Sequence, residues 1–343
     1  MRHLKFALII VPLLLTSCLE VKTTTRIRKD GSIERMVSLK GSPETIEETR
    51  FNIPREDKAL WMISQDSVDS ENDRYEARAT FESIEALNTS FALNAESPGV
   101  QIKSTLLLDE GFFFDRYYYM EKIWSDLPGP EVSMTPYITK AELESLILNE
   151  MESDSGSMSK VDTDRLSKQM DAYLEDVIFK DFVIELREGG HRSGHIKAID
   201  EMIKAHADSL QEKLNSTNYY DDNPVWKEIL AEYIDTLIIN AVELSNEEGF
   251  LRFYQDWSFF NDVLVDDYQF SVELPGVIRK TTALDVRGNL MSWEPSPVRL
   301  FFGGITLEAE SSVIKPWSLI ITGILLLITL VVTVAGWMRR PRN

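Results

Sequence analysis

The chain has 343 residues, a formal net charge of −20 at pH 7 and one cysteine, Cys18. A single cysteine excludes an intramolecular disulfide and a metal site built from a cysteine cluster. All acidic residues lie between positions 19 and 314. Residues 19–314 therefore carry a net charge of −26. A surface of that charge repels nucleic-acid phosphates and anionic lipid headgroups, so we expect neither as a broad-contact partner.

The N-terminal residues 1–17 have the order of a secretory signal peptide. Arg2 and Lys5 form a short basic region, and an apolar stretch follows at 6–15. This stretch is too short to cross a bilayer comfortably, and small polar residues come after it. The pattern predicts a signal peptide and not a structural helix.

The segment Leu15-Thr16-Ser17-Cys18 resembles the lipobox of bacterial lipoproteins. The resemblance implies cleavage between Ser17 and Cys18 and a lipid on the Cys18 sulfur. Acyl chains contribute about 0.8 kcal/mol per buried methylene, and two or more chains make membrane binding stable. The alternative is an ordinary secretory signal or an uncleaved anchor with an incidental cysteine.

Residues 18–129 are predicted to form the N-terminal part of an ectodomain. Apolar and polar residues alternate through 19–40 on both sides of Asp30-Gly31, which predicts a β-hairpin. We expect a short helix over 55–65, further strands at Tyr75–Phe81, Val100–Leu108 and Phe112–Ile123, and a helical or irregular segment at Ser83–Leu93.

The aromatic run Phe112–Tyr119 has two interpretations. Its side chains can form a surface that touches lipid or glycan, or the strand can be a central one packed on both faces. The sequence leaves this choice open.

Residues 130–262 are predicted to form a helical insertion that begins after Leu127-Pro128-Gly129-Pro130. Apolar residues recur at helical spacing in several stretches of it, and Gly189-Gly190 is expected to interrupt them. The segment Gly190–His195, with His206, is a weak metal candidate, because its glycines disfavour the helix that would bring two histidines together.

Residues 263–314 are predicted to return to strands, at Tyr268–Leu274, Lys280–Val286, Leu290–Trp293 and Leu300–Glu310. Strands at both ends with helices between them predict an α+β fold. We expect an antiparallel sheet platform built from the N- and C-terminal strands, with a helical insertion and one C-terminal transmembrane helix.

The transmembrane helix is predicted at 315–338, since Trp317–Met338 contains no charged residue. Lys315 precedes it, and Trp317 and Trp337 lie at its ends, where aromatic belts form. Arg339 and Arg340 belong to a basic tail, 339–343, which the positive-inside rule places in the cytoplasm.

Together the two anchors predict a protein of a bacterial cytoplasmic (inner) membrane with an extracytoplasmic ectodomain. Its lipid partners are the acyl anchor on Cys18 and the bilayer around the helix. Because the first strand starts near Cys18 and the last ends near Lys315, we expect both to lie at the membrane-proximal end of one sheet.

The strand and turn around Ile27–Ile33, the segments Leu274-Pro275-Gly276 and Gly288–Trp293, and the apolar helix with its basic tail resemble LppM-type bacterial lipoproteins. The resemblance covers the two ends of the chain, and the long helical insertion departs from it. It implies an α/β extracytoplasmic domain with roles in lipid or host contact. It supplies no catalytic residues.

No catalytic or cofactor-binding residues and no cofactor are predicted. The sequence has no G-x-S-x-G, P-loop or G-x-G-x-x-G motif, and its acidic pairs Asp221-Asp222, Glu247-Glu248 and Asp266-Asp267 are typical of solvated surfaces. We therefore expect a non-enzymatic module that binds a partner protein or an amphiphile beside the membrane. The alternatives are a glycan hydrolase using paired carboxylates and a structural scaffold.

Overall fold

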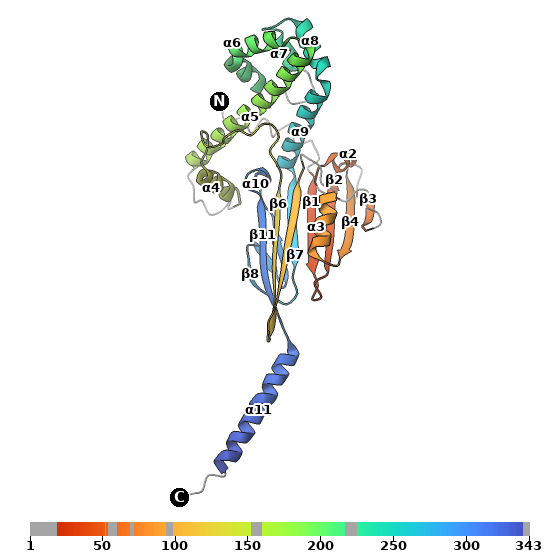
Figure 1. Ribbon diagram of the computed structural model, residues 1–343, viewed down its shortest axis with the longest axis vertical. Helices are drawn as coiled ribbons and strands as arrows, with labels where there is room; N and C mark the ends of the chain where they lie inside the picture. The colour runs from red at the N-terminus through yellow and green to blue at the C-terminus, as the bar shows by residue number, and fades with distance from the viewer. Residues whose placement is uncertain are drawn as a thin grey trace.

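The computed structural model describes residues 19–51, 53, 60–68, 72–93, 99–151, 160–216 and 225–338. Two β-sheets pack against each other, a helical lobe extends from one end, and a long helix, α11, leaves the other end (Figure 1). The predicted α+β fold class is confirmed, with strands on both sides of a run of helices and one apolar helix after them.

The seven-stranded sheet has the order β3-β4-β2-β1-β7-β10-β9. Its central strand β1 pairs antiparallel with β2 and parallel with β7, so strands from the two ends of the described chain are neighbours. Its members are β1 (Glu20–Ile27), β2 (Ile33–Gly41), β3 (Met62–Ser67), β4 (Asp73–Phe81), β7 (Asp267–Glu273), β9 (Asp285–Arg287) and β10 (Leu290–Trp293).

The second sheet has four strands in the order β5-β6-β11-β8. It also joins early and late strands, because β6 pairs with β11 over the full length of β11. The platform thus consists of two sheets and contains one parallel pairing. The members are β5 (Gln101–Glu110), β6 (Phe114–Trp124), β8 (Val277–Thr281) and β11 (Ile305–Ile314).

The β1–β2 hairpin forms where the sequence predicts it. Alternate side chains of both strands are buried between the sheets, and the others face outward. Gly31 takes a φ of 83°, which a glycine adopts without steric cost, and the Asp30 carboxylate accepts a hydrogen bond from the Ser32 amide at 3.0 Å. Local turn chemistry and the alternation therefore agree.

The helical lobe follows β6. Its longest helix, α5, continues through Gly189 and Gly190, so the predicted interruption there is wrong. A Cβ atom on Gly189 would lie 2.5 Å from the Val242 carbonyl oxygen of α8, so the glycine permits close helix packing that outweighs its low helix propensity. The helices are α4 (Lys140–Met151), α5 (Lys160–Ser193), α6 (Ile196–Asn215), α7 (Val225–Leu230), α8 (Thr236–Ser245) and α9 (Glu247–Val265).

Three shorter helices remain to be described, and three further predictions are corrected. The strand predicted at Lys280–Val286 forms two strands, β8 and β9, which belong to different sheets. The helix predicted over 55–65 is contradicted at its end, since 62–67 is strand β3, paired with β4. The strand predicted at Leu300–Glu310 begins later, after a helical turn, and runs to Ile314. The helices are α2 (Pro43–Glu48), α3 (Ile84–Leu93) and α10 (Val298–Phe301), and α11 spans Pro316–Met338.

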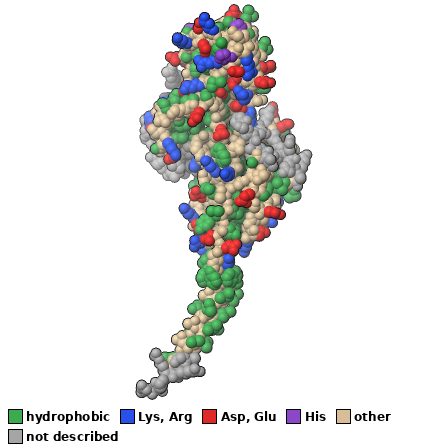
Figure 2. Space-filling model, in the orientation of Figure 1, with side chains coloured by type: hydrophobic (Ala, Val, Ile, Leu, Met, Phe, Trp, Pro, Cys, Tyr) green, Lys and Arg blue, Asp and Glu red, His purple; other side chains and the backbone are tan. Residues whose placement is uncertain are grey.

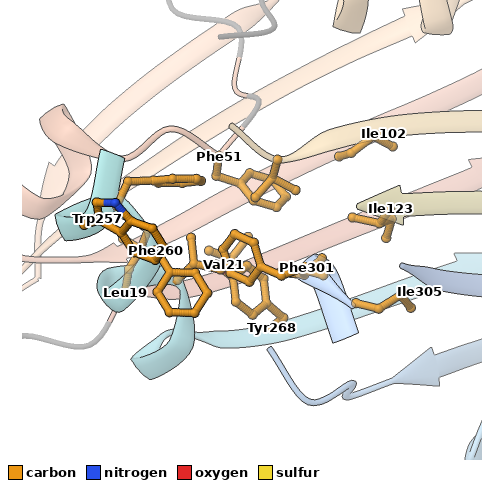
Figure 3. Packing of buried hydrophobic residues seen from close by; sticks show 14 of the residues in the cluster. Leu19, Val21, Phe51, Ile102, Ile123, Trp257, Phe260, Tyr268, Phe301 and Ile305 are labelled. Atoms are coloured by element: carbon orange, nitrogen blue, oxygen red, sulfur yellow. The ribbon is translucent and has the colours of Figure 1, made fainter. Parts of the chain in front are cut away.

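Charged side chains are spread over the sheets and the lobe, whereas the surface of α11 is apolar (Figure 2). The core continues from the sheets into the base of the lobe, where Phe260 of α9 and Phe301 of α10 have ring centroids 4.7 Å apart (Figure 3). Fully buried Leu19 also lies at this junction.

The two ends of the described chain lie at opposite ends of the sheets. The Leu19 carbonyl accepts a hydrogen bond from the Asp267 amide, two residues after the end of α9. At the opposite end of the sheets, α11 begins two residues after the end of β11. The turn after β1 lies toward α11, since the Lys29 carbonyl accepts a hydrogen bond from Tyr117, which pairs with Ser311. Strands from both ends of the chain do share one sheet, since Thr25 is aligned with Val286 across β7 and β10. The expectation that the start of β1 and the end of β11 lie at the same end is wrong, because β1 runs toward α11 and not away from it.

Candidate functional site

The helix α11 is long and apolar enough to cross a membrane by length and composition. Its 23 residues extend about 34 Å at 1.5 Å per residue, which suits a hydrocarbon core of roughly 30 Å. Trp317 and Trp337 are both exposed near its ends. Lys315 precedes it, and the Arg339 and Arg340 predicted to flank its other end lie outside the described residues.

The β5–β6 hairpin ends beside the start of α11. Residues Gly111–Phe114, which we call the hairpin tip, form a turn closed by a 3.0 Å hydrogen bond from the Gly111 amide to the Phe114 carbonyl. A Cβ atom on Gly111 would lie 2.7 Å from that carbonyl oxygen, so the turn requires glycine. Phe112, Phe113 and Phe114 remain 53%, 39% and 38% exposed.

Three contacts hold the hairpin tip and the adjacent Asp115 against Lys315 and the first turn of α11. The Lys315 amide donates a 2.9 Å hydrogen bond to the Phe113 carbonyl. The Lys315 ammonium lies 2.7 Å from Asp115, and both side chains are about four-fifths buried. Phe112 packs edge-on against Trp317, with ring centroids 5.3 Å apart. The tip is therefore held at the level of the first turn of the apolar helix.

The aromatic run is both core and surface. The three phenylalanines at the tip are exposed, whereas Tyr117 and Tyr119 point between the sheets and are 2% exposed. Burial raises the pKa of Tyr119 well above its ordinary value, with the nearby Glu121 carboxylate contributing. The strand is therefore not packed on both faces, because β6 buries alternate side chains only. Contact of the exposed phenylalanines with lipid or glycan stays a prediction.

A buried ion pair joins the two sheets. Arg35 of β2 and Glu121 of β6 are fully buried, and their charged groups are 2.8 Å apart. The same Glu121 oxygen accepts hydrogen bonds from Ser104 and Tyr119, each at 2.7 Å. Its other oxygen has no hydrogen-bond partner among the described residues. A buried ion pair adds little net stability, whereas removing one partner leaves an unpaired buried charge and is strongly destabilising.

A second buried carboxylate, Asp266, lies between α9 and β7. It accepts hydrogen bonds from the Leu19 amide at 3.1 Å and from the Tyr268 hydroxyl at 3.2 Å. Burial raises its pKa to about 7 despite these bonds. Asp266 therefore ties the first described residue to the base of the lobe.

The remaining sequence candidates are scattered. Ser17 and Cys18 lie outside the described residues, as does the Asp221-Asp222 pair. Asp267 and the Glu247-Glu248 pair are exposed. The described residues contain no group of three His, Cys, Asp or Glu side chains that could hold a metal ion.

The sequence interpretation missed Arg35 and Glu121. It also placed Asp266 in a solvated acidic pair, which is wrong, because Asp266 is buried between α9 and β7. Arg35 lies on the buried face of β2 together with Ile33 and Val37. Glu121 lies on the buried face of β6 together with Tyr119. A charged residue at a position where the alternation predicts a buried side chain could have indicated each of these two residues.

Comparisons with known proteins show a weak likeness only. No family model and no curated protein matches the chain. A similar solved structure is the NMR structure of the folded domain of the LppM protein of Mycobacterium tuberculosis, with a TM-score of 0.33 and 9% identity. The match covers 88% of this chain and 94% of that one. At this level it carries no argument about fold or function.

Proposed function

We propose that the protein is a non-enzymatic, membrane-anchored module that binds a partner protein or an amphiphile next to the membrane. The observation that carries this proposal is the exposed hairpin tip fixed to the first turn of α11. Three adjacent exposed aromatic side chains are unfavourable in water and are typical of a contact surface. Their attachment to an apolar helix indicates contact beside a bilayer.

The same proposal includes the placement of the chain. The basic residues Arg339 and Arg340 favour a cytoplasmic C-terminus, with residues 19–314 on the other side of a bacterial inner membrane. Cleavage after Ser17 and a lipid on Cys18 would agree with that placement.

Photocrosslinking in intact membranes tests the binding proposal. A benzophenone amino acid at Phe113 should give adducts with a specific protein or with lipid. The same amino acid at Leu237 in α8 is the matched control, because Leu237 is 76% exposed and lies in the lobe remote from α11. Adducts that are absent at Phe113, or equal at both positions, would count against the proposal.

Membrane attachment is measured separately. The full chain should stay in the membrane fraction during carbonate extraction, and a chain that stops at Lys315 should lose the attachment that α11 provides. To isolate α11 from any lipid anchor, both chains carry Cys18→Ser. Release of the full-length Cys18→Ser chain would overturn α11 as a membrane anchor.

A further inference from the structure

We infer that the hairpin tip is a second membrane contact, seated among lipid headgroups beside α11, so that the amphiphile it touches is the bilayer itself. This inference rests on the proposed function, because it requires α11 to cross the membrane. It names the chemistry of the partner at the tip, a lipid surface, and not a protein.

The first argument is continuity with α11. The contact between Phe112 and Trp317 places the tip at the level of the first helical turn, where a spanning helix passes through the interface. The hydrogen bond from the Lys315 amide to the Phe113 carbonyl keeps the tip from moving along the helix. If α11 spans a bilayer, the phenylalanines are thereby placed at the depth at which aromatic belts form.

The second argument is the charge boundary above the tip. The next two pairs of the hairpin ladder are Glu110 with Asp115 and Asp109 with Arg116. We call these four residues the charged collar. Charged side chains are costly to place in a hydrocarbon core, so these four residues stay on the water-facing side of the tip. The collar therefore limits insertion to the tip.

The third argument is the anchoring of the collar itself. Asp115 is paired with Lys315, and Lys315 directly precedes α11. The same ion pair thus marks the water-facing boundary for the hairpin and for the helix. The exposed Leu107 and Leu108 lie on β5 beyond the collar, on the side toward the sheets, and are not part of the tip.

Spin labelling of the full-length chain tests the inference. Cys18→Ser removes the only native cysteine, and a nitroxide is attached at Phe113→Cys in vesicles of phosphatidylcholine. Label collisions with oxygen and with a water-soluble nickel chelate are then compared. Ile328→Cys in α11 is the lipid control and Leu237→Cys in α8 is the water control.

We expect the Phe113 label to lose most of the nickel collisions seen at Leu237 and to gain oxygen collisions, in the direction of Ile328. Adding Phe112→Asp and Phe114→Asp to Phe113→Cys should restore nickel collisions at the tip and leave those at Ile328 unchanged. All three tip side chains are exposed, so circular dichroism should show an unchanged fold.

The outcomes separate the inference from the proposed function. Nickel access at Phe113 equal to that at Leu237, with Ile328 protected, overturns the lipid contact and leaves α11 as an anchor. Dipolar broadening between Phe113 labels in two chains also overturns it, because a second copy then covers the tip. Nickel access at Ile328 overturns the membrane anchor and both proposals with it.

Discussion

Replacing Asp266 with asparagine should remove a pH dependence of stability. Burial raises the pKa of this carboxyl from 3.8 to about 7. Each pKa unit corresponds to about 1.4 kcal/mol, so ionising Asp266 in the folded chain costs about 4 kcal/mol. Because the folded state binds this proton more tightly than the unfolded state, stability falls as the pH rises from about 4 to about 7.

The amide of Asp266→Asn stays neutral and can still accept the hydrogen bond from the Leu19 amide. We therefore expect the variant to be close to the wild type at pH 4, differing by about 1 kcal/mol for altered hydrogen bonds. At pH 8 it should be more stable by up to about 4 kcal/mol. At roughly 2 °C per kcal/mol for a large domain, its Tm should rise by about 8 °C.

Thermal melts of the full chain in non-ionic detergent, followed by near-ultraviolet circular dichroism from pH 4 to 8, measure this difference. Asp267→Asn is the matched control, because Asp267 is exposed and adjacent. A Tm difference between Asp266→Asn and the wild type that does not change with pH would refute the reasoning, since it would mean that the buried carboxyl ionises at no cost.

Two further predictions concern packing between elements. Arg35→Met leaves Glu121 as an unpaired buried charge, so it should lower the unfolding free energy by about 3–5 kcal/mol. Adding Glu121→Met should recover much of this loss, and equal Tm values for the single and double variants would contradict the prediction. Gly189→Ala should destabilise the chain, because the new Cβ meets the Val242 carbonyl of α8. In an unobstructed helix, alanine would instead be up to about 1 kcal/mol more favourable than glycine. A higher Tm for the variant would show that α8 moves away at little cost.

The parts of the fold that follow from local chemistry could be predicted from the sequence. The β1–β2 hairpin combines alternation with Asp30-Gly31, and α11 is a single uncharged run, so neither depends on distant residues. The partition of the strands into two sheets depends on pairings such as β6 with β11. Such partners lie far apart in sequence, and alternation indicates a strand without naming its neighbour.

The site shows the same limit. Consecutive aromatic residues in Phe112–Tyr119 fit either face of a strand, and only the position of the turn at Gly111 decides which ones reach solvent. The inward register of Arg35 predicts a buried partner, yet Glu121 becomes that partner only when the second sheet packs on the first. Continuity of α5 through Gly189 likewise depends on α8, which the local sequence does not contain.

The position of Leu19 constrains how the lipid proposed on Cys18 and the helix α11 share one bilayer. Leu19 is fully buried and its amide is bonded to Asp266, so it cannot act as a loose tether. From Leu19 to the end of β1 is eight residues, about 26 Å at 3.3 Å per residue, and α11 starts beyond that end. A lipid on Cys18 would be attached one residue before this fixed position. Both anchors therefore reach one membrane only if the strands run along its surface.

A chain lipidated on Cys18 should consequently lie along the membrane, and the Cys18→Ser variant, held at its other end alone, should tilt away from it. A donor dye on Leu237→Cys in α8 and an acceptor dye in the lipid report this change. Leu19 is hydrogen-bonded to Asp266 and Asp267 after α9, and the lobe extends from the end of the sheets opposite α11 (Figure 1). Energy transfer should fall in Cys18→Ser, together with the loss of labelling by a clickable fatty acid. Labelling that persists in Cys18→Ser would overturn the lipid. If labelling is lost but energy transfer does not change, the lipid does not set the orientation of the sheets, and β1 instead opens at Leu19 to let the lipid reach the bilayer. In that case Asp266→Ala, which removes the acceptor of the Leu19 amide hydrogen bond, should leave energy transfer unchanged as well.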